Sequence, residues 1–215
     1  MSGPVRLGPS DGRVILRTYR EGLAAQVGHD LVLEFAAWSA LATPPGAQGG
    51  PAIEASIELS SLRVLEGTGG VKPLTDRDRR DIAGNARKSL DSERHPQAVY
   101  RSAALTPSAE GGTFDGTLSL HGVERPLRLA VTRKPEGGYL ARATVTQSEH
   151  GIKPYSAFFG TLKLRDAVEL EIEITTDLAA AATDGHGDTD GDTDGDTDGD
   201  TVGDGAGGPE ASREA

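Results

Sequence analysis

Two alternating apolar segments on either side of a short turn constrain the fold of this chain more than any other feature. Residues 114–131 read FDGTLSLHGVERPLRLAV, with turn-forming residues at 121–124. The apolar residues fall on one face of the two segments: Phe114, Gly116, Leu118, Leu120, Leu127, Leu129 and Val131. Because successive side chains of a strand point to opposite faces, this period of two predicts a β-hairpin with one apolar face. Such a sheet must pack on a second layer or curl around an interior.

Similar segments recur along the chain, and most are separated by short loops rich in glycine. The expected strands are 13–18, 29–38, 53–59, 98–104, 113–120, 125–132, 139–146 and 162–175. Within 29–38 the alternation slips at Ala36 and Ala37, which predicts a bulge that redirects Trp38. About eight strands joined mainly by hairpins are typical of an all-β up-and-down antiparallel barrel or of a sandwich.

One amphipathic helix is expected over residues 75–93. Thr75 can cap its start, and Asp76 and Asp78 suit the positive end of the helix dipole. A narrow apolar stripe consists of Ile82, Ala86 and Leu90. We expect His95 and Pro96 to end the helix, because proline disfavours helix in the residue before it. The helix should lie against the sheet or plug one end of a barrel.

The last part of the chain differs in composition from the rest. Residues 179–215 hold 11 of the 33 acidic side chains and one of the 22 basic ones, and Val202 is their only large apolar residue. Such a segment cannot bury enough surface to offset the entropy of ordering. The sequence therefore predicts one folded domain over residues 13–177 and a disordered, acidic Asp/Gly/Thr-rich tail over residues 178–215.

The folded part is nearly neutral, since residues 1–178 carry 22 acidic and 21 basic side chains. A neutral domain with an acidic tail lacks the positive field that binding to a phosphate backbone requires. Nucleic acid is therefore not expected as a partner, and anionic membrane surfaces are disfavoured on the same ground.

Cysteine is absent, which excludes disulfides, thiolate metal sites and a cysteine nucleophile. No stretch approaches the roughly 18 apolar residues of a membrane span, and the first residues lack the apolar core of a signal peptide. We expect a cytoplasmic protein that does not span a membrane, and homodimer formation is left open.

The content of the predicted interior is the functional question. Several positions expected to face inward are small: Ala55, Ala103, Gly116, Ala141 and Ala143. Small inward residues leave room for one ligand in a barrel of about eight strands. The alternative, that larger neighbours fill these gaps as an ordinary core, stays open at this point.

Four segments in this order resemble the YceI-like family of polyisoprenoid-binding, lipocalin-like domains: HDLVLEF, RHPQAVYRS, FDGTLSLHGVERPLRL and GIKPYSAFFGTLKLRDAVELEIE. The resemblance covers approximately residues 14–175. It implies an elongated antiparallel barrel whose apolar lumen binds an isoprenoid or a similar fatty-chain amphiphile, without catalysis and without a cofactor. Many family members begin with a signal peptide and act in the periplasm, and this sequence departs from them there.

The residues predicted to contact the ligand are apolar or aromatic, with one arginine. They are Leu33, Phe35, Trp38, Tyr100, Arg101, Leu118, Leu120, Leu129, Tyr155 and Phe158. Arg101 is expected to point inward, toward a protein carboxylate or an anionic head group, because an unpaired buried charge is costly. Tyr155, Phe158 and Phe159 either gate one end of the barrel or follow a structural turn.

Two other functions remain as alternatives to lipid binding. One is an enzyme that acts on a hydrophobic small molecule with His29 or His95 as acid or base, and the other is a protein-interaction module that works through the tail. His29, Asp30, His121 and His150 fit no short-range ligand spacing, and no metal site is predicted. The aspartates of the tail do not form an EF-hand, since the twelfth position counted from Asp190 is Thr201.

Overall fold

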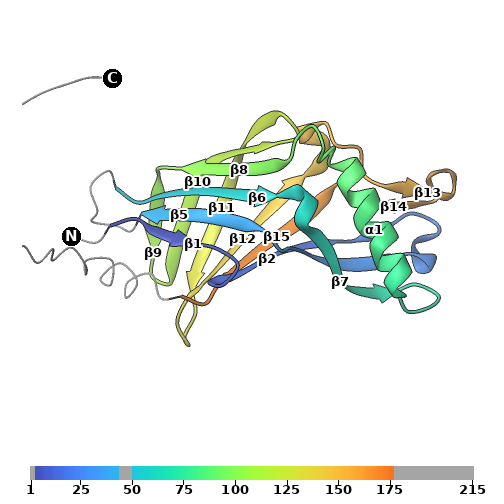
Figure 1. The fold of residues 1–215 in the computed structure, drawn as a ribbon, viewed down its shortest axis with the longest axis horizontal. Coiled ribbons are helices and arrows are strands. Elements are labelled where there is room, and N and C mark those ends of the chain that lie inside the picture. Colours follow the sequence, from blue (N-terminus) through green and yellow to red (C-terminus); the bar gives the residue numbers. More distant parts are fainter. Residues whose placement is uncertain (1–2, 44–49, 177–215) are drawn as a thin grey trace, which may run out of the picture.

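The chain forms a strongly curled antiparallel sheet of the lipocalin-like class with one α-helix across it (Figure 1). The computed structural model describes residues 3–43 and 50–176. The predicted acidic tail lies outside the described residues, so its disorder and its partners stay predictions. The all-β fold class with one helix is confirmed.

Twelve strands make up the main sheet, and their neighbours follow the order β1-β5-β6-β8-β10-β11-β12-β15-β2-β4-β7, with β9 paired to β10. A second sheet has the order β13-β14-β3. The strands are β1 (Val5–Leu7), β2 (Gly12–Thr18), β3 (Arg20–Glu21), β4 (His29–Phe35), β5 (Trp38–Thr43), β6 (Ala52–Glu58), β7 (Leu62–Gly69), β8 (Gln97–Ser102), β9 (Leu105–Ser108), β10 (Gly111–Leu120), β11 (Val123–Arg133), β12 (Tyr139–Thr146), β13 (Ser156–Ala157), β14 (Leu162–Leu164) and β15 (Ala167–Ile174).

The sheet curls because two long strands bend at the same corner. β4 continues into β5 through Ala36 and Ala37, and β6 continues into β7 through the 3₁₀ turn Leu59–Ser61. Across the corner the Ala36 amide donates to the Ser61 carbonyl and the Glu58 amide donates to the Ala37 carbonyl, at 3.3 and 3.0 Å. If each bent pair is counted once and the short β1 and β9 are left out, the main sheet has the eight strands that the sequence predicts.

The hairpin of β10 and β11 turns more tightly than its sequence suggested. Leu120 pairs with Val123, so the turn is His121 and Gly122 alone, with φ of 54° and 74°. Two central residues with positive φ make a type I′ turn, whose twist matches that of the flanking strands. Val123 and Glu124, expected in the turn, begin β11 instead.

Helix α1 spans Asp76–Ser89 and begins where the sequence predicts. The Thr75 hydroxyl accepts the Asp78 amide while the Asp78 carboxylate accepts the Thr75 amide, which is a reciprocal capping box. The expected end at His95 and Pro96 is wrong. The helix stops earlier because Asp91 takes a left-handed conformation, and the Ser92 amide donates to the Arg87 carbonyl as in a Schellman motif.

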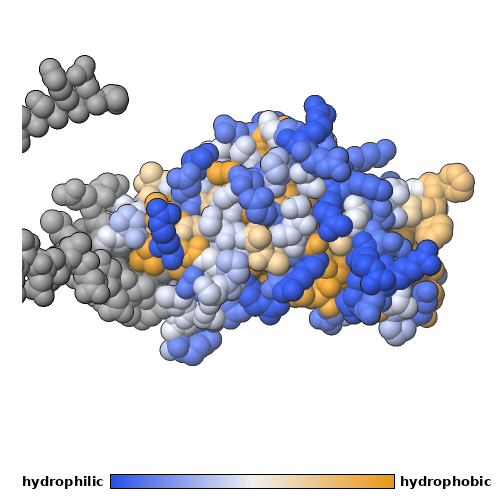
Figure 2. Space-filling view, in the orientation of Figure 1, coloured by the Kyte–Doolittle hydropathy of each residue, from blue (hydrophilic) through white to orange (hydrophobic). Residues whose placement is uncertain are grey.

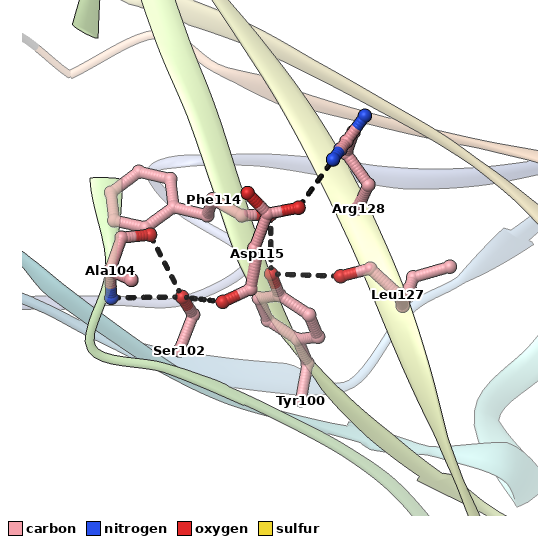
Figure 3. Close-up of polar contacts among 7 residues, drawn as sticks. All are labelled: Tyr100, Ser102, Ala104, Phe114, Asp115, Leu127 and Arg128. Carbon is pink, nitrogen blue, oxygen red and sulfur yellow. Dashed lines mark hydrogen bonds and ion pairs between the residues drawn. The ribbon is translucent and has the colours of Figure 1, made fainter. Parts of the chain in front are cut away.

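Side chains from β8 replace backbone pairing where the sheet is interrupted (Figure 3). β8 pairs with β10 only from Val99 to Arg101, and β9 takes its place beyond that point. The Tyr100 hydroxyl donates to the Phe114 carbonyl at 3.0 Å, and the Ser102 hydroxyl donates to the Asp115 carbonyl at 2.7 Å. These bonds hold β8 against β10 beyond the residues where the two backbones pair.

The outer face of the sheet is largely hydrophilic and cross-linked by ion pairs (Figure 2). Glu34 on β4 is the most enclosed of these groups, at 5% exposed, and it accepts bonds from Arg13 on β2 and Arg63 on β7. Burial opposes the ionisation of this carboxyl, but the two arginines outweigh it and hold the pKa of Glu34 below its ordinary value of 4.5.

We expect Glu34→Gln to lower the free energy of unfolding by about 1–2 kcal/mol at neutral pH, since both arginines are half exposed and solvent screens them. A carboxyl with a depressed folded-state pKa contributes stability above pH 4.5 and loses it as the pH falls through the folded pKa. The variant should therefore show a flatter loss of stability in acid. Urea unfolding as a function of pH measures both effects.

Glu54→Gln, which breaks the exposed pair with Arg101, is the control and should change the free energy of unfolding little. Equal effects of the two variants would contradict the prediction.

Candidate ligand cavity

A cavity of about 320 Å³ lies inside the curl of the sheet, at the end where α1 and the second sheet are placed. Its wall is mainly apolar. The inward side chains of β2, β4, β10 and β15 and one face of α1 form most of it, contributing Leu16, Leu31, Leu33, Phe35, Ile82, Ala86, Leu90, Leu118, Leu120, Val168 and Leu170. A volume of this size and an apolar wall are typical of a small-molecule site.

The other end of the curled sheet is filled by side chains. On β2 the inward residue Leu16 lines the cavity, whereas the next inward residue, Val14, belongs to the packed core. Their register partners on β15, Leu170 and Ile172, divide in the same way. The packed end contains Leu7, Val14, Trp38, Tyr100, Phe114, Leu129, Ala141 and Ile174. Both interpretations of the interior are therefore partly correct, because one half is a core and the other half is hollow.

Seven polar residues line the cavity, and three of their side chains are held by backbone carbonyls. The Arg20 guanidinium donates to the Gly28 carbonyl at 2.6 Å and to the Thr68 carbonyl at 3.1 Å. His29 Nε2 lies 2.9 Å from the Lys72 carbonyl, and the Gln147 amide donates to the Arg165 carbonyl at 3.0 Å. These bonds fix the positions of the three side chains at the mouth.

Thr18 differs from these three side chains. It lies on β2 between Leu16 and Arg20, is 4% exposed, and its hydroxyl has no hydrogen-bond partner. A buried hydroxyl without a partner costs about 1–3 kcal/mol. Its place between the apolar interior and the polar mouth is where the polar end of an amphiphile would meet the protein.

Five of the ten predicted ligand residues line the cavity: Leu33, Phe35, Leu118, Leu120 and Tyr155. Three others, Trp38, Tyr100 and Leu129, lie outside the cavity wall, at the packed end, and their contact with a ligand stays a prediction. All three side chains face inward, but the sequence could not show which part of the interior is filled by side chains and which part is hollow. Gly116 leaves no free space either, because the Tyr100 ring occupies it: a Cβ at Gly116 would lie 2.6 Å from the Tyr100 hydroxyl.

The prediction that Arg101 points inward is wrong. On β8 the inward residues are Ala98, Tyr100 and Ser102, so Arg101 faces outward. Its guanidinium pairs with the carboxylate of Glu54 at 2.9 Å on an exposed surface. The partner of Arg101 is therefore a protein carboxylate, one of the two partners expected from the sequence, but the pair lies on the outside of the sheet. Ala103 is exposed as well, because the chain leaves the sheet after Ser102.

Phe158 does not line the cavity but is 64% exposed beside its mouth, next to Phe159. Residues that the sequence reasoning missed come from β2, α1 and β15. The alternation of Val14, Leu16 and Thr18 and the stripe of Ile82, Ala86 and Leu90 were visible signals, but nothing in the sequence showed that they face one cavity.

The histidines separate into two places. His29 lies at the mouth, whereas His95 is outside the cavity, with its ring centroid 5.2 Å from that of His121. His121 and His150 each contact a backbone carbonyl through Nδ1, at 3.1 Å. Among the described residues, no group of three or more histidine, cysteine or carboxylate side chains could hold a metal ion. In residues 3–43 and 50–176 no helix has the length and apolarity to cross a membrane.

Comparison with known proteins places the fold and the sequence in one family. The model of the YceI-like domain matches residues 23–176. The structure of BcnA from Burkholderia cenocepacia is similar with a TM-score of 0.54 and 14% identity, over 77% of this chain and 96% of that one. A YceI protein from Campylobacter jejuni (TM-score 0.47, 15% identity, 66% and 81% covered) is more distant.

A third similar structure is a domain from Saccharophagus degradans described as polyisoprenoid-binding (TM-score 0.48, 12% identity, 81% and 97% covered). No curated protein matches this sequence. The match of the family model spans most of the chain, from the residues that follow β3 to the end of β15. This chain belongs to the YceI-like family.

Proposed function

We propose that this protein binds a single isoprenoid or similar long-chain amphiphile and carries it, with the apolar chain in the cavity and the polar end at the mouth. The observation that supports this most directly is the distribution of polarity. The wall is mainly apolar; Thr18, Arg20, His29 and Lys163 lie on or beside the loops that surround the opening, and Asn85 and Ser89 add polar atoms from α1.

The energetics favour a chain-like ligand over a compact polar one. Burying one methylene contributes about 0.8 kcal/mol, so a five-carbon isoprene unit contributes on the order of 3–4 kcal/mol before the cost of association. Because this attraction has no direction, selectivity should follow the length and girth of the chain more than its chemistry. We propose a non-catalytic role, and the engagement of His29 Nε2 with a backbone carbonyl is consistent with it.

Native mass spectrometry of the protein after mild purification from its source cells tests the proposal. We expect one bound lipid per chain, and after delipidation we expect reloading with geranylgeraniol in a one-to-one ratio. Farnesol and geraniol should bind progressively more weakly. Failure of the emptied protein to take up any prenyl alcohol or fatty alcohol would overturn the proposal.

We expect Thr18→Val to stabilise the empty protein by about 1 kcal/mol, because valine has the same shape and removes a hydroxyl that lacks a partner. In the loaded protein the sign should reverse for a ligand whose polar end bonds to this hydroxyl. Thermal unfolding with and without geranylgeraniol measures both effects. Thr144→Val, on β12 and outside the cavity wall, serves as the control. Destabilisation of the empty Thr18→Val protein would contradict the prediction.

A further inference from the structure

Among the residues that the structure describes, the large apolar side chains that are exposed lie at one end of the domain. Across residues 3–43 and 50–176, six large hydrophobic residues are strongly exposed: Leu23, Val27, Val71, Tyr155, Phe158 and Phe159. All six lie in three segments, 22–28, 70–75 and 151–163. In Figure 1 these segments meet at the end that carries β13, and Figure 2 shows apolar atoms projecting there. We call these six residues the apolar rim.

The rim surrounds the mouth of the cavity. The Ala24 amide donates to the Thr161 carbonyl at 2.9 Å, which joins the first and third segments, and His29 Nε2 contacts the Lys72 carbonyl, which joins the second. Val27 and Tyr155 belong to both the rim and the cavity wall. The apolar surface is therefore continuous from the outside of the molecule into the cavity.

Two aromatic residues of the rim project outward from an unusual backbone. Phe158 and Phe159 have φ of 48° and 55°, in the left-handed region that bulky residues rarely adopt. Phe159 is fully exposed and Phe158 is 64% exposed. The local conformation presents both rings to the surroundings.

The charge of this end differs from that of the rest of the domain. The three segments contain Lys72, Lys153 and Lys163 and no acidic residue, whereas the described residues together hold 21 basic and 21 acidic side chains. Acidic residues flank the three segments: Glu21 directly precedes the first and is the register partner of Lys163, and Asp76 and Asp78 begin α1, where Asp78 is occupied by the capping box. None of the three lysines forms an ion pair with another described residue.

We propose that the apolar rim docks on the surface of a lipid bilayer, with Phe158 and Phe159 inserted among the headgroups and the mouth of the cavity facing the acyl chains. This inference rests on the proposed function. A ligand that is poorly soluble in water then enters and leaves the cavity without crossing the aqueous phase. Lysines beside inserted aromatic rings match the charge and polarity of a phospholipid interface.

A bilayer explains the shape of the rim better than a protein partner. Two rings that project from a narrow tip suit shallow insertion into a fluid interface, whereas a stable protein interface buries about 800 Å² on each side. A second copy or another protein on this end would also cover the mouth of the cavity. The neutral charge of the whole domain does not oppose docking, because the lysines are gathered at the end that meets the membrane.

Co-sedimentation with vesicles tests the proposal on the full chain. We expect binding to phosphatidylcholine vesicles and tighter binding when phosphatidylglycerol is included. The double variant Phe158→Ser, Phe159→Ser should lower partitioning about a hundredfold on both. The double variant Lys72→Gln, Lys153→Gln should lower it about fivefold per lysine on the anionic vesicles and little on the neutral ones.

Three controls make the outcome decisive. Native mass spectrometry should show that the delipidated phenylalanine variant reloads with geranylgeraniol in solution as the wild type does, since neither ring lines the cavity. Vesicle binding by a wild-type protein that never holds a lipid would overturn the proposed function and leave the docking surface intact. Absence of vesicle binding by the wild-type protein, equal binding by the phenylalanine variant, or a wild-type dimer in sedimentation that this variant abolishes would overturn the docking proposal.

Discussion

A tryptophan at Leu170 is expected to abolish lipid binding while the fold persists. Leu170 points inward from β15, lines the cavity and is only partly buried, because part of its surface faces the hollow. An indole at this position occupies space that several methylenes of a ligand would fill. Displacing about four methylenes removes about 3 kcal/mol of binding free energy, which is a loss of affinity of at least about a hundredfold.

The matched control is Ala130→Trp on β11, which adds the same side chain to the exposed outer face. Titration with geranylgeraniol, followed by native mass spectrometry, measures affinity, and far-ultraviolet circular dichroism reports the fold. Retention of lipid by Leu170→Trp at wild-type affinity would show that the cavity is not where the ligand binds. Loss of binding in both variants would show that the effect is not specific to the cavity.

Truncation of Tyr100 is expected to produce the largest loss of stability. The ring is 7% exposed and fills the space over Gly116, and its hydroxyl donates to the Phe114 carbonyl. Burial raises the pKa of this phenol, so it stays a neutral donor throughout the physiological range. Tyr100→Ala removes both the packing and the bond and should cost about 3–5 kcal/mol.

Tyr100→Phe separates the two contributions, because it keeps the ring and removes only the hydroxyl. We expect a cost of about 1 kcal/mol for this variant, from the loss of the hydrogen bond that the hydroxyl donates. Equilibrium unfolding in urea measures both changes. If phenylalanine were as harmful as alanine, the hydrogen bond would dominate, and the assignment of Tyr100 to packing at the closed end would be wrong.

Much of the fold could be predicted from the sequence because the signals are local. The alternation in β10, β11, β12 and β15 comes from the two-residue period of a strand, and the start of α1 comes from a cap that needs only Thr75 and Asp78. β7 was missed because glycines at 67 and 69 make its segment look like a loop, although pairing with β4 orders it. The end of α1 was misplaced because an aspartate takes the left-handed position that glycine usually occupies.

The cavity could be predicted only in part. Alternation shows which side chains face inward, which is why Leu33, Phe35, Leu118 and Leu120 were found. Alternation does not show which part of the interior is packed with side chains. Trp38 and Leu129 were therefore predicted to contact the ligand, although they lie in the packed core. For Arg101 the register itself was misjudged by one residue, and a shift of one exchanges the two faces of a strand.

The sequence by itself determined the class of the fold and the family, because periodicity, turn residues and motif order are carried by neighbouring residues. Only the tertiary structure decided which half of the interior is hollow, because packing depends on the bend at Ala36 and Ala37, on Tyr100 lying over Gly116, and on α1 crossing the open end. Only the tertiary structure brought the residues of the apolar rim together. Its residues are scattered from Leu23 to Phe159 along the chain, and only the arrangement of three loops brings them together around one opening.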